Sequence, residues 1–211
     1  MLWSVPERQG GARPRHAAVV CHPHPLFGGT MHNKVVYQTA KTLHGFGLPV
    51  LRFNFRGTGL SEGQHDEGRG EQGDVSSALD FLAAKFPGAS LLLAGFSFGS
   101  WVGLRVACSD PRVTDLIGIG LPVGSLGDRE FAYLGACDKP KLLVSGELDR
   151  YGPPEKLEAM AARFSPRVKE RTSIAIISGA DHFFAGRLPE LERTIAEWLT
   201  AQHPDLAANG A

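Results

Sequence analysis

The chain has 211 residues, of which 43% are hydrophobic and 21% are charged, a composition typical of a globular protein with a sizeable core. Its 22 Lys and Arg residues are scattered and balance its 22 Asp and Glu residues, so we expect neither a nucleic-acid nor a membrane partner. The three cysteines, Cys21, Cys108 and Cys137, are widely spaced, so we predict no disulfide framework. We see neither a secretory signal pattern nor a long apolar run, and therefore predict a cytoplasmic protein.

Strand and helix patterns alternate along the chain. In chain order we predict strands over residues 2–5, 17–21, 49–55, 91–96, 113–119, 141–145 and 172–177. Helices are predicted from Asn33 to Gly45 or Gly47, over 75–86, directly after Ser97, between Pro153-Pro154 and Pro166, and over 188–199. The remainder of residues 1–16 is assigned to a loop, and residues 204–211 to a frayed tail.

The predicted strands are apolar on both faces, which is typical of a mostly parallel sheet covered by helices on each side. We therefore expect an α/β protein, a three-layer α/β/α sandwich, in a single domain spanning residues 1–211. In such sheets ligands bind beyond the carboxyl ends of the strands. The loops to examine are those that follow residues 21, 55, 96, 119, 145 and 177.

One predicted strand runs directly into Gly95-Phe96-Ser97-Phe98-Gly99, and a helical pattern follows at once. A Gly-x-Ser-x-Gly motif in this strand-to-helix context is typical of a nucleophile elbow, in which a sharp turn presents the serine hydroxyl. The glycines let strand and helix approach closely. The alternative is a serine in a Gly-rich turn that binds phosphate. We predict that Ser97 is a nucleophile.

A nucleophilic serine needs a base, and the base needs an orienting group. Asp149 follows the strand at 141–145 and His182 follows the strand at 172–177, so both reach the same sheet edge as Ser97. The order Ser, Asp, His is the order of α/β-hydrolase triads. Other acids near these strand ends are Glu147, Asp181 and Asp128, and we favour Asp149 because of its position in its loop.

An acyl-transfer site also needs N–H donors for an oxyanion. The first predicted donor is the backbone of Phe98, the residue after the nucleophile. The second is expected in the loop after residue 21, where Pro23 and Pro25 have no N–H. Either His24 or Leu26 fits, and the sequence does not choose between them.

The same loop could suggest a metal site, since His22, His24 and His32 lie near Cys21. No Asp or Glu stands at ligand spacing nearby, so we predict no metal and no other cofactor, and expect His22 to bond backbone and shape the loop. The Gly-rich residues 57–63 lack a phosphate-binding pattern and are interpreted as a turn. Arg56 is expected to pair with Glu71 or Asp74 rather than with a substrate anion.

Four stretches together resemble the α/β-hydrolase superfamily over nearly the whole chain. They are Cys-His-Pro-His-Pro-Leu-Phe-Gly-Gly-Thr-Met-His-Asn-Lys at 21–34, Phe-Asn-Phe-Arg-Gly-Thr-Gly at 53–59, Gly-Phe-Ser-Phe-Gly at 95–99 and Asp-His-Phe-Phe at 181–184. The closest resemblance is to small bacterial alpha/beta hydrolases related to the dienelactone hydrolase family. It implies the α/β-hydrolase fold, a Ser97–His182–Asp149 triad and ester-type hydrolysis without a cofactor. Serine stands where dienelactone hydrolases carry cysteine, which argues against dienelactone itself as substrate.

The sequence thus predicts a serine hydrolase that cleaves carboxylic esters or thioesters of small acyl substrates through an acyl-enzyme. No insertion of lid size separates Gly120 from Lys141, so we expect an open site walled by aromatic residues, with minimal or no lid. The expected walls are Phe27, Phe98, Tyr133, Tyr151 and Phe183. Alternatives are other triad chemistry (peptidase, perhydrolase, dienelactone-type C–O hydrolysis) or a non-catalytic binding module on the same fold. A monomer or a homodimer is expected.

Overall fold

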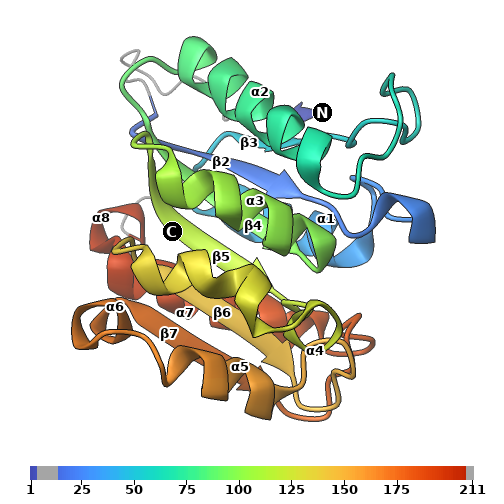
Figure 1. The fold of residues 1–211 in the computed structure, drawn as a ribbon. Coiled ribbons are helices and arrows are strands. Elements are labelled where there is room, and N and C mark those ends of the chain that lie inside the picture. The colour runs from blue at the N-terminus through green and yellow to red at the C-terminus, as the bar shows by residue number, and fades with distance from the viewer. Residues whose placement is uncertain (4–13, 208–211) are drawn as a thin grey trace.

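The computed structural model describes residues 1–3 and 14–207 of the chain, and within them seven strands form one sheet (Figure 1). Their order across the sheet is β1-β3-β2-β4-β5-β6-β7. All neighbouring pairs are parallel except β1 and β3, which are antiparallel. The strands are β1 Leu2–Trp3, β2 His16–Cys21, β3 Val50–Arg52, β4 Ser90–Phe96, β5 Val113–Ile119, β6 Lys141–Gly146 and β7 Thr172–Ile177.

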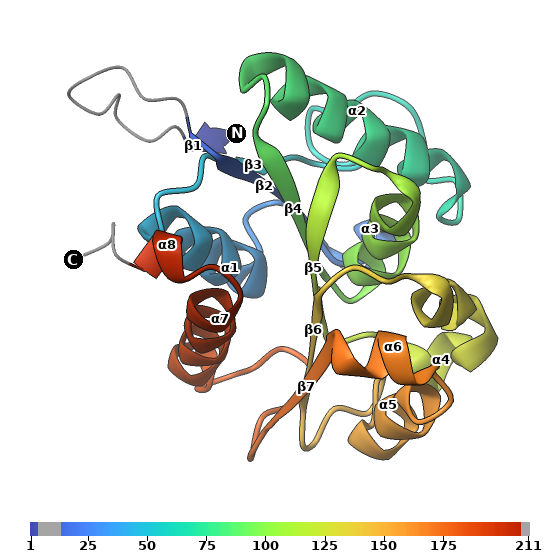
Figure 2. The ribbon, with the colours of Figure 1, turned by 90° about the vertical axis from the view of Figure 1, so that its left-hand side faces the viewer.

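Helices cover both faces of this sheet (Figure 2). One face carries α1 (Lys34–Gly45), α7 (Leu188–Gln202) and α8 (Pro204–Ala207). The other carries α2 (Arg69–Lys85), α3 (Phe98–Ser109), α4 (Val123–Leu126), α5 (Pro154–Ala161) and α6 (Pro166–Glu170), with the 3₁₀ helix η2 (Asp128–Ala136). A second 3₁₀ helix, η1 (Pro25–Phe27), follows β2. The expected three-layer α/β/α architecture is confirmed.

Strand β4 shows why the sheet has a core on each side. Leu91 and Leu93 are buried in the cluster beneath α2 and α3, while Leu92 and Ala94 are buried in the cluster beneath α1 and α7. Successive side chains of a strand point to opposite faces, so a strand covered on both faces must be apolar throughout. Burial on both sides makes β4 a rigid support for the residue that follows it.

Several predicted elements differ from the structure. The helix expected over 75–86 is α2, which already begins at Arg69 and ends at Lys85. The strand expected over 49–55 ends at Arg52, because the chain then turns and the N–H of Phe55 donates to a side chain, His22 Nε2, instead of to a neighbouring strand. Beyond α5 a second short helix, α6, was not predicted; the side chain of Ser165 caps it. Of the edge strand expected over 2–5, β1 covers Leu2–Trp3, and residues 4 and 5 lie outside the described residues.

The tail prediction is wrong for residues 204–207, which form α8. His203, just before α8, contacts Asp115 of β5 at 3.0 Å, and this contact joins the end of the chain to the sheet. Residues 208–211, the rest of the predicted tail, lie outside the described residues.

The segment between β5 and β6 contains only α4 and η2 within residues 120–140, so no lid domain is inserted there. Across the described parts of the chain, none of the helices combines the length and the apolar character needed to span a bilayer.

Candidate active site

Ser97 occupies a sharp turn between β4 and α3. Its φ is 53°, a left-handed conformation that non-glycine residues seldom adopt. The flanking glycines are needed for space: a Cβ on Gly95 would lie 2.3 Å from the Gly99 carbonyl oxygen, and a Cβ on Gly99 would lie 2.5 Å from the carbonyl oxygens of Cys21 and His22. The structure therefore has the nucleophile-elbow geometry, with α3 pressed against the end of β2.

The three side chains predicted to act together meet at this turn. His182 Nε2 lies 3.0 Å from Ser97 Oγ, and His182 Nδ1 lies 2.8 Å from Asp149 Oδ2. The side chain of Asp149 is fully buried and that of His182 is 7% exposed. The rings of Phe96 and Tyr151 lie 5.1 and 4.7 Å from the imidazole and hold it between them. A hydroxyl, an imidazole and a buried carboxylate thus form one hydrogen-bonded chain.

The loop after β6 fixes the carboxylate of Asp149. Asp149 Oδ1 accepts hydrogen bonds from the N–H groups of Tyr151 and Gly152, at 2.8 and 2.9 Å. Because one oxygen is held by backbone donors, the other is directed at the imidazole of His182.

The other acids considered from the sequence have different partners. Glu147 accepts from Ser178 Oγ and from the N–H of Gly179. Asp181 Oδ1 accepts from the N–H groups of Phe183 and Ala185, as expected of a turn residue. Asp128 forms an ion pair with Arg163. Of the four acids, only Asp149 is bonded to His182 in the described structure.

His22 shapes the loop after β2, as the sequence predicts. Its side chain is buried, Nε2 accepts from the N–H of Phe55 at 2.9 Å, and Nδ1 donates to the carbonyl of Pro23 at 2.6 Å. Both ring nitrogens are therefore engaged by the backbone, which removes His22 from the alternative metal cluster. Burial lowers the pKa of His22 to about 4, so the imidazole is neutral near pH 7.

This buried imidazole should make the protein sensitive to acid. Because the pKa of His22 falls to about 4 on folding, the unfolded chain binds its proton more readily, and the stabilisation is complete above about pH 6.5 and is lost as pH falls toward 4. The expected loss is on the order of 3 kcal/mol in the free energy of unfolding. Urea unfolding at pH 7 and 4.5 measures it.

A matched pair of variants isolates the effect. His22→Gln should have a lower free energy of unfolding than wild type at pH 7. The difference between the two free energies should narrow at pH 4.5, because glutamine does not titrate. His32→Gln, at an exposed histidine, should keep the pH dependence of the wild type. A gap between His22→Gln and wild type that stays constant over this range would contradict the assignment.

The two candidates for the second oxyanion donor differ in their contacts. The N–H of Leu26 points to the imidazole of His24, 3.3 Å from Nδ1, and so serves the short helix η1. The N–H of His24 has no protein acceptor among the described residues. The His24 ring lies 4.9 Å from the ring of Phe98, the residue whose own N–H opens α3. Of the two alternatives, His24 is the residue whose N–H is unengaged in the described structure, and it lines the same cavity as Ser97.

A cavity of about 540 Å³ opens at Ser97 and His182. Its walls include Phe27, Phe98, Tyr151 and Phe183, as expected, and also Trp101, His65 and Glu67. Trp101 was not among the predicted walls; it lies in α3, four residues after Ser97, and no sequence signal distinguished it from the other apolar residues of that helix. The surface of the cavity is mainly apolar, and its polar residues include His24 and His65.

Tyr133 does not line this cavity, and its prediction as a wall is wrong. Its ring belongs to η2 and packs on the core cluster, and its hydroxyl donates to the carbonyl of Trp101 at 2.9 Å. Burial raises the pKa of this phenol. The 3₁₀ helix turns Tyr133 under α3, a placement that a sequence pattern does not specify.

The polar side of the cavity depends on a buried acid. Glu71 is fully buried, accepts from the N–H groups of Asp66 and Gly68, and lies 2.9 Å from His65 Nδ1. His65 in turn packs against His24, with ring centroids 4.8 Å apart. Arg56 pairs with Asp74 at 2.8 Å, which is one of the two partners predicted.

Comparison with known proteins places this architecture in a family. The model of the alpha/beta hydrolase domain matches residues 17–204. An uncharacterized protein from Rickettsia prowazekii is 38% identical over 184 residues, covering 86% of this chain and 77% of its own.

Solved structures agree. An alpha-beta serine hydrolase homologue from Coxiella burnetii has a TM-score of 0.82 and 38% identity, covering 93% of this chain and 89% of that one. A lid-less serine hydrolase from Xanthomonas campestris has a TM-score of 0.82 and 32% identity, covering 95% and 87%. The resemblance to bacterial alpha/beta hydrolases is confirmed, while the relation to dienelactone hydrolases stays a prediction. Because the family model takes in every strand from β2 to β7, the chain belongs to the alpha/beta hydrolase domain family.

Proposed function

We propose that this protein is a serine hydrolase that cleaves carboxylic esters or thioesters through an acyl-enzyme. The observation that carries the proposal is the 3.0 Å contact between Ser97 Oγ and His182 Nε2, in a histidine whose other nitrogen lies 2.8 Å from Asp149. Ser97 attacks the acyl carbon while His182 takes its proton, and His182 then returns that proton to the leaving alcohol or thiol. Asp149 orients the imidazole and stabilises its cationic form.

The oxyanion of the tetrahedral intermediate would be held by the N–H groups of Phe98 and His24. Phe98 is the first residue of α3, where backbone N–H groups lack helical acceptors and the helix dipole favours negative charge. The close approach of Gly99 to the carbonyl oxygens of Cys21 and His22 brings the loop after β2 beside this helix end. Donors from both segments support acyl-transfer chemistry.

The cavity indicates the substrate class. Phe27, Trp101 and Phe183 offer apolar surface, and none of the described residues that line the cavity is a lysine or an arginine. Acyl or alcohol groups of small apolar or aromatic character fit such walls better than anionic groups do. Without a lid the site stays accessible, which favours substrates of modest size.

Active-site labelling tests the proposal. The folded protein is treated with a fluorophosphonate probe, digested and mapped, and then assayed on a panel of p-nitrophenyl esters, thioesters and peptide amides. Labelling at Ser97 with hydrolysis of esters or thioesters is expected. An unlabelled Ser97 would contradict the proposal, and cleavage of amides alone would replace it with a peptidase.

The apolar wall can be tested separately. Phe27 is 86% exposed, so Phe27→Ala should leave the fold intact while removing substrate contact area. We expect KM to rise about 5- to 20-fold for hexanoate or benzoate esters, with kcat nearly unchanged and little effect on acetate esters. Phe81→Ala, which removes another exposed aromatic outside the cavity, is the control. Equal effects on acetate and on hexanoate would contradict the role of Phe27.

A further inference from the structure

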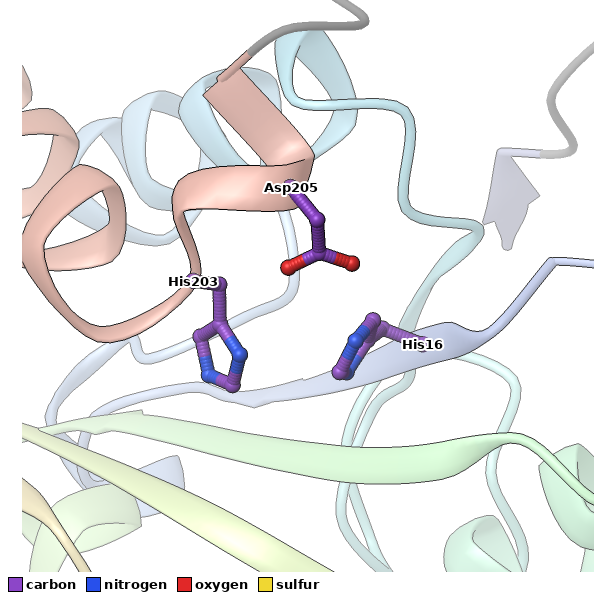
Figure 3. Close-up of side chains that lie close together, drawn as sticks. All are labelled: His16, His203 and Asp205. Carbon is purple, nitrogen blue, oxygen red and sulfur yellow. The ribbon is translucent and has the colours of Figure 1, made fainter.

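Two histidines and an aspartate gather at the end of the sheet opposite Ser97. His16 begins β2 and pairs in register with Ser90, the first residue of β4, whereas Ser97 follows the last residue of that strand. His203 and Asp205 come from the end of α7 and from α8, which return to this edge (Figure 3). Segments far apart in sequence thus converge at a place with no part in the proposed hydrolysis.

The side chains of His16, His203 and Asp205 point toward one another (Figure 3). Each offers one ligand atom, a ring nitrogen or a carboxylate oxygen, and these atoms all lie within 4.8 Å of one another. The two imidazole rings are 4.8 Å apart between centroids. His16 and His203 are half-buried and Asp205 is exposed, so the cluster is open to solvent on one side.

A fourth residue orients one of the histidines. Asp115 of β5 is 3% exposed, and its Oδ1 lies 3.0 Å from His203 Nε2. If Nε2 donates its proton to this carboxylate, the lone pair of the ring stands on Nδ1. A buried carboxylate that fixes the tautomer of a ligating histidine is the usual outer partner of protein metal sites.

We propose that His16, His203 and Asp205 bind a divalent transition-metal ion, with zinc the best match, and that Asp115 is a positioning residue for His203. Two imidazole nitrogens and one carboxylate oxygen are ligands that Zn²⁺ prefers, and water from the open side completes a tetrahedron. Calcium and magnesium prefer oxygen ligands throughout, so the two histidines disfavour them.

The three ligand atoms need to move only a little to coordinate one ion. Ligands about 2.1 Å from a tetrahedral ion stand about 3.4 Å apart, so the three atoms must close by on the order of 1 Å, within reach of side-chain rotation.

Such an ion would join the start of β2 to the C-terminal segment. Its role would be structural, because the cluster lies across the sheet from Ser97. An ion that binds the folded chain but not the unfolded chain shifts the unfolding equilibrium toward the folded state. Zinc should therefore raise the melting temperature and hold α8 against the sheet.

The test uses the full chain after EDTA treatment and dialysis, with Zn²⁺ added in a calorimeter and in thermal melts. Wild type should bind one zinc per chain at this cluster, and His16→Ala or His203→Ala should weaken that binding by at least about 100-fold. Asp205→Asn and Asp115→Asn should weaken it about tenfold. His32→Ala, at an exposed histidine remote from the cluster in sequence, should bind like wild type.

Two further measurements keep the outcome decisive. The variant His16→Ala/His203→Ala/Asp205→Asn reports zinc bound elsewhere, including at the histidines of the cavity, and Co²⁺ absorption reports whether nitrogen ligands surround the ion. The proposal stands if the zinc-dependent rise in melting temperature and the tetrahedral Co²⁺ bands are lost in the triple variant. It is overturned if wild type and the triple variant bind zinc equally, whether or not that zinc affects hydrolysis.

Discussion

Ser97→Ala is expected to lower kcat/KM for p-nitrophenyl acetate by at least about 10³-fold, because the hydroxyl that lies against the base His182 is removed. The side chain removed is small and sits in a turn whose shape depends on Gly95 and Gly99. The melting temperature should therefore change little. A steady-state assay with a parallel thermal melt measures both quantities.

The control is Ser109→Ala, at the far end of α3, where the hydroxyl only bonds carbonyls of its own helix. It should hydrolyse the ester at the wild-type rate. Turnover by Ser97→Ala that persists after contaminating esterases are removed would refute Ser97 as the nucleophile. Loss of activity in both variants would point to damage to α3 instead.

Asp149→Asn is expected to lower kcat by about 10³- to 10⁴-fold with little change in KM. The backbone N–H groups of Tyr151 and Gly152 would still hold the amide oxygen, which leaves the amide NH₂ facing His182 Nδ1. An N–H donor at that position favours the proton on Nε2, so the imidazole can no longer accept the proton of Ser97. Geometry is retained while the base is lost.

Glu147→Gln is the matched control, because Glu147 lies two residues away and is bonded to Ser178 and Gly179 rather than to His182. It should retain nearly full kcat. If Glu147→Gln lost as much activity as Asp149→Asn, the assignment of Asp149 as the specific carboxylate that orients His182 would be wrong. If Asp149→Asn kept wild-type kcat, Asp149 would have no part in the reaction.

Chain order and strand direction alone place Ser97, Asp149 and His182 at one end of the sheet, and the structure brings their side chains together. Gly95 and Gly99 bracket Ser97 because a turn this tight excludes a Cβ at both positions. His182 and Asp149 follow neighbouring parallel strands, whose carboxyl ends share one edge. These relations depend only on the order of glycines and strands along the chain, so they can be read from a single sequence.

Other features required contacts that no local pattern encodes. Tyr133 and Trp101 are both aromatic residues in helical segments. The hydroxyl of Tyr133 bonds the backbone of α3, whereas the side chain of Trp101 lines the cavity. The sequence did not choose between His24 and Leu26 as the second oxyanion donor. In the structure the N–H of Leu26 is directed at the His24 imidazole within η1. Side-chain direction in irregular segments depends on packing against distant residues.

By itself, the order of apolar strands, glycines and polar strand ends determined the layered sheet and placed Ser97 and His182 at the same end of that sheet, because both follow from a period of two or 3.6 residues and from chain direction. Only the tertiary structure decided which acid faces His182, which aromatic rings form the walls and that His16 meets His203 and Asp205. The contact between His16 and His203 joins segments separated by most of the chain, and folding alone brings them together.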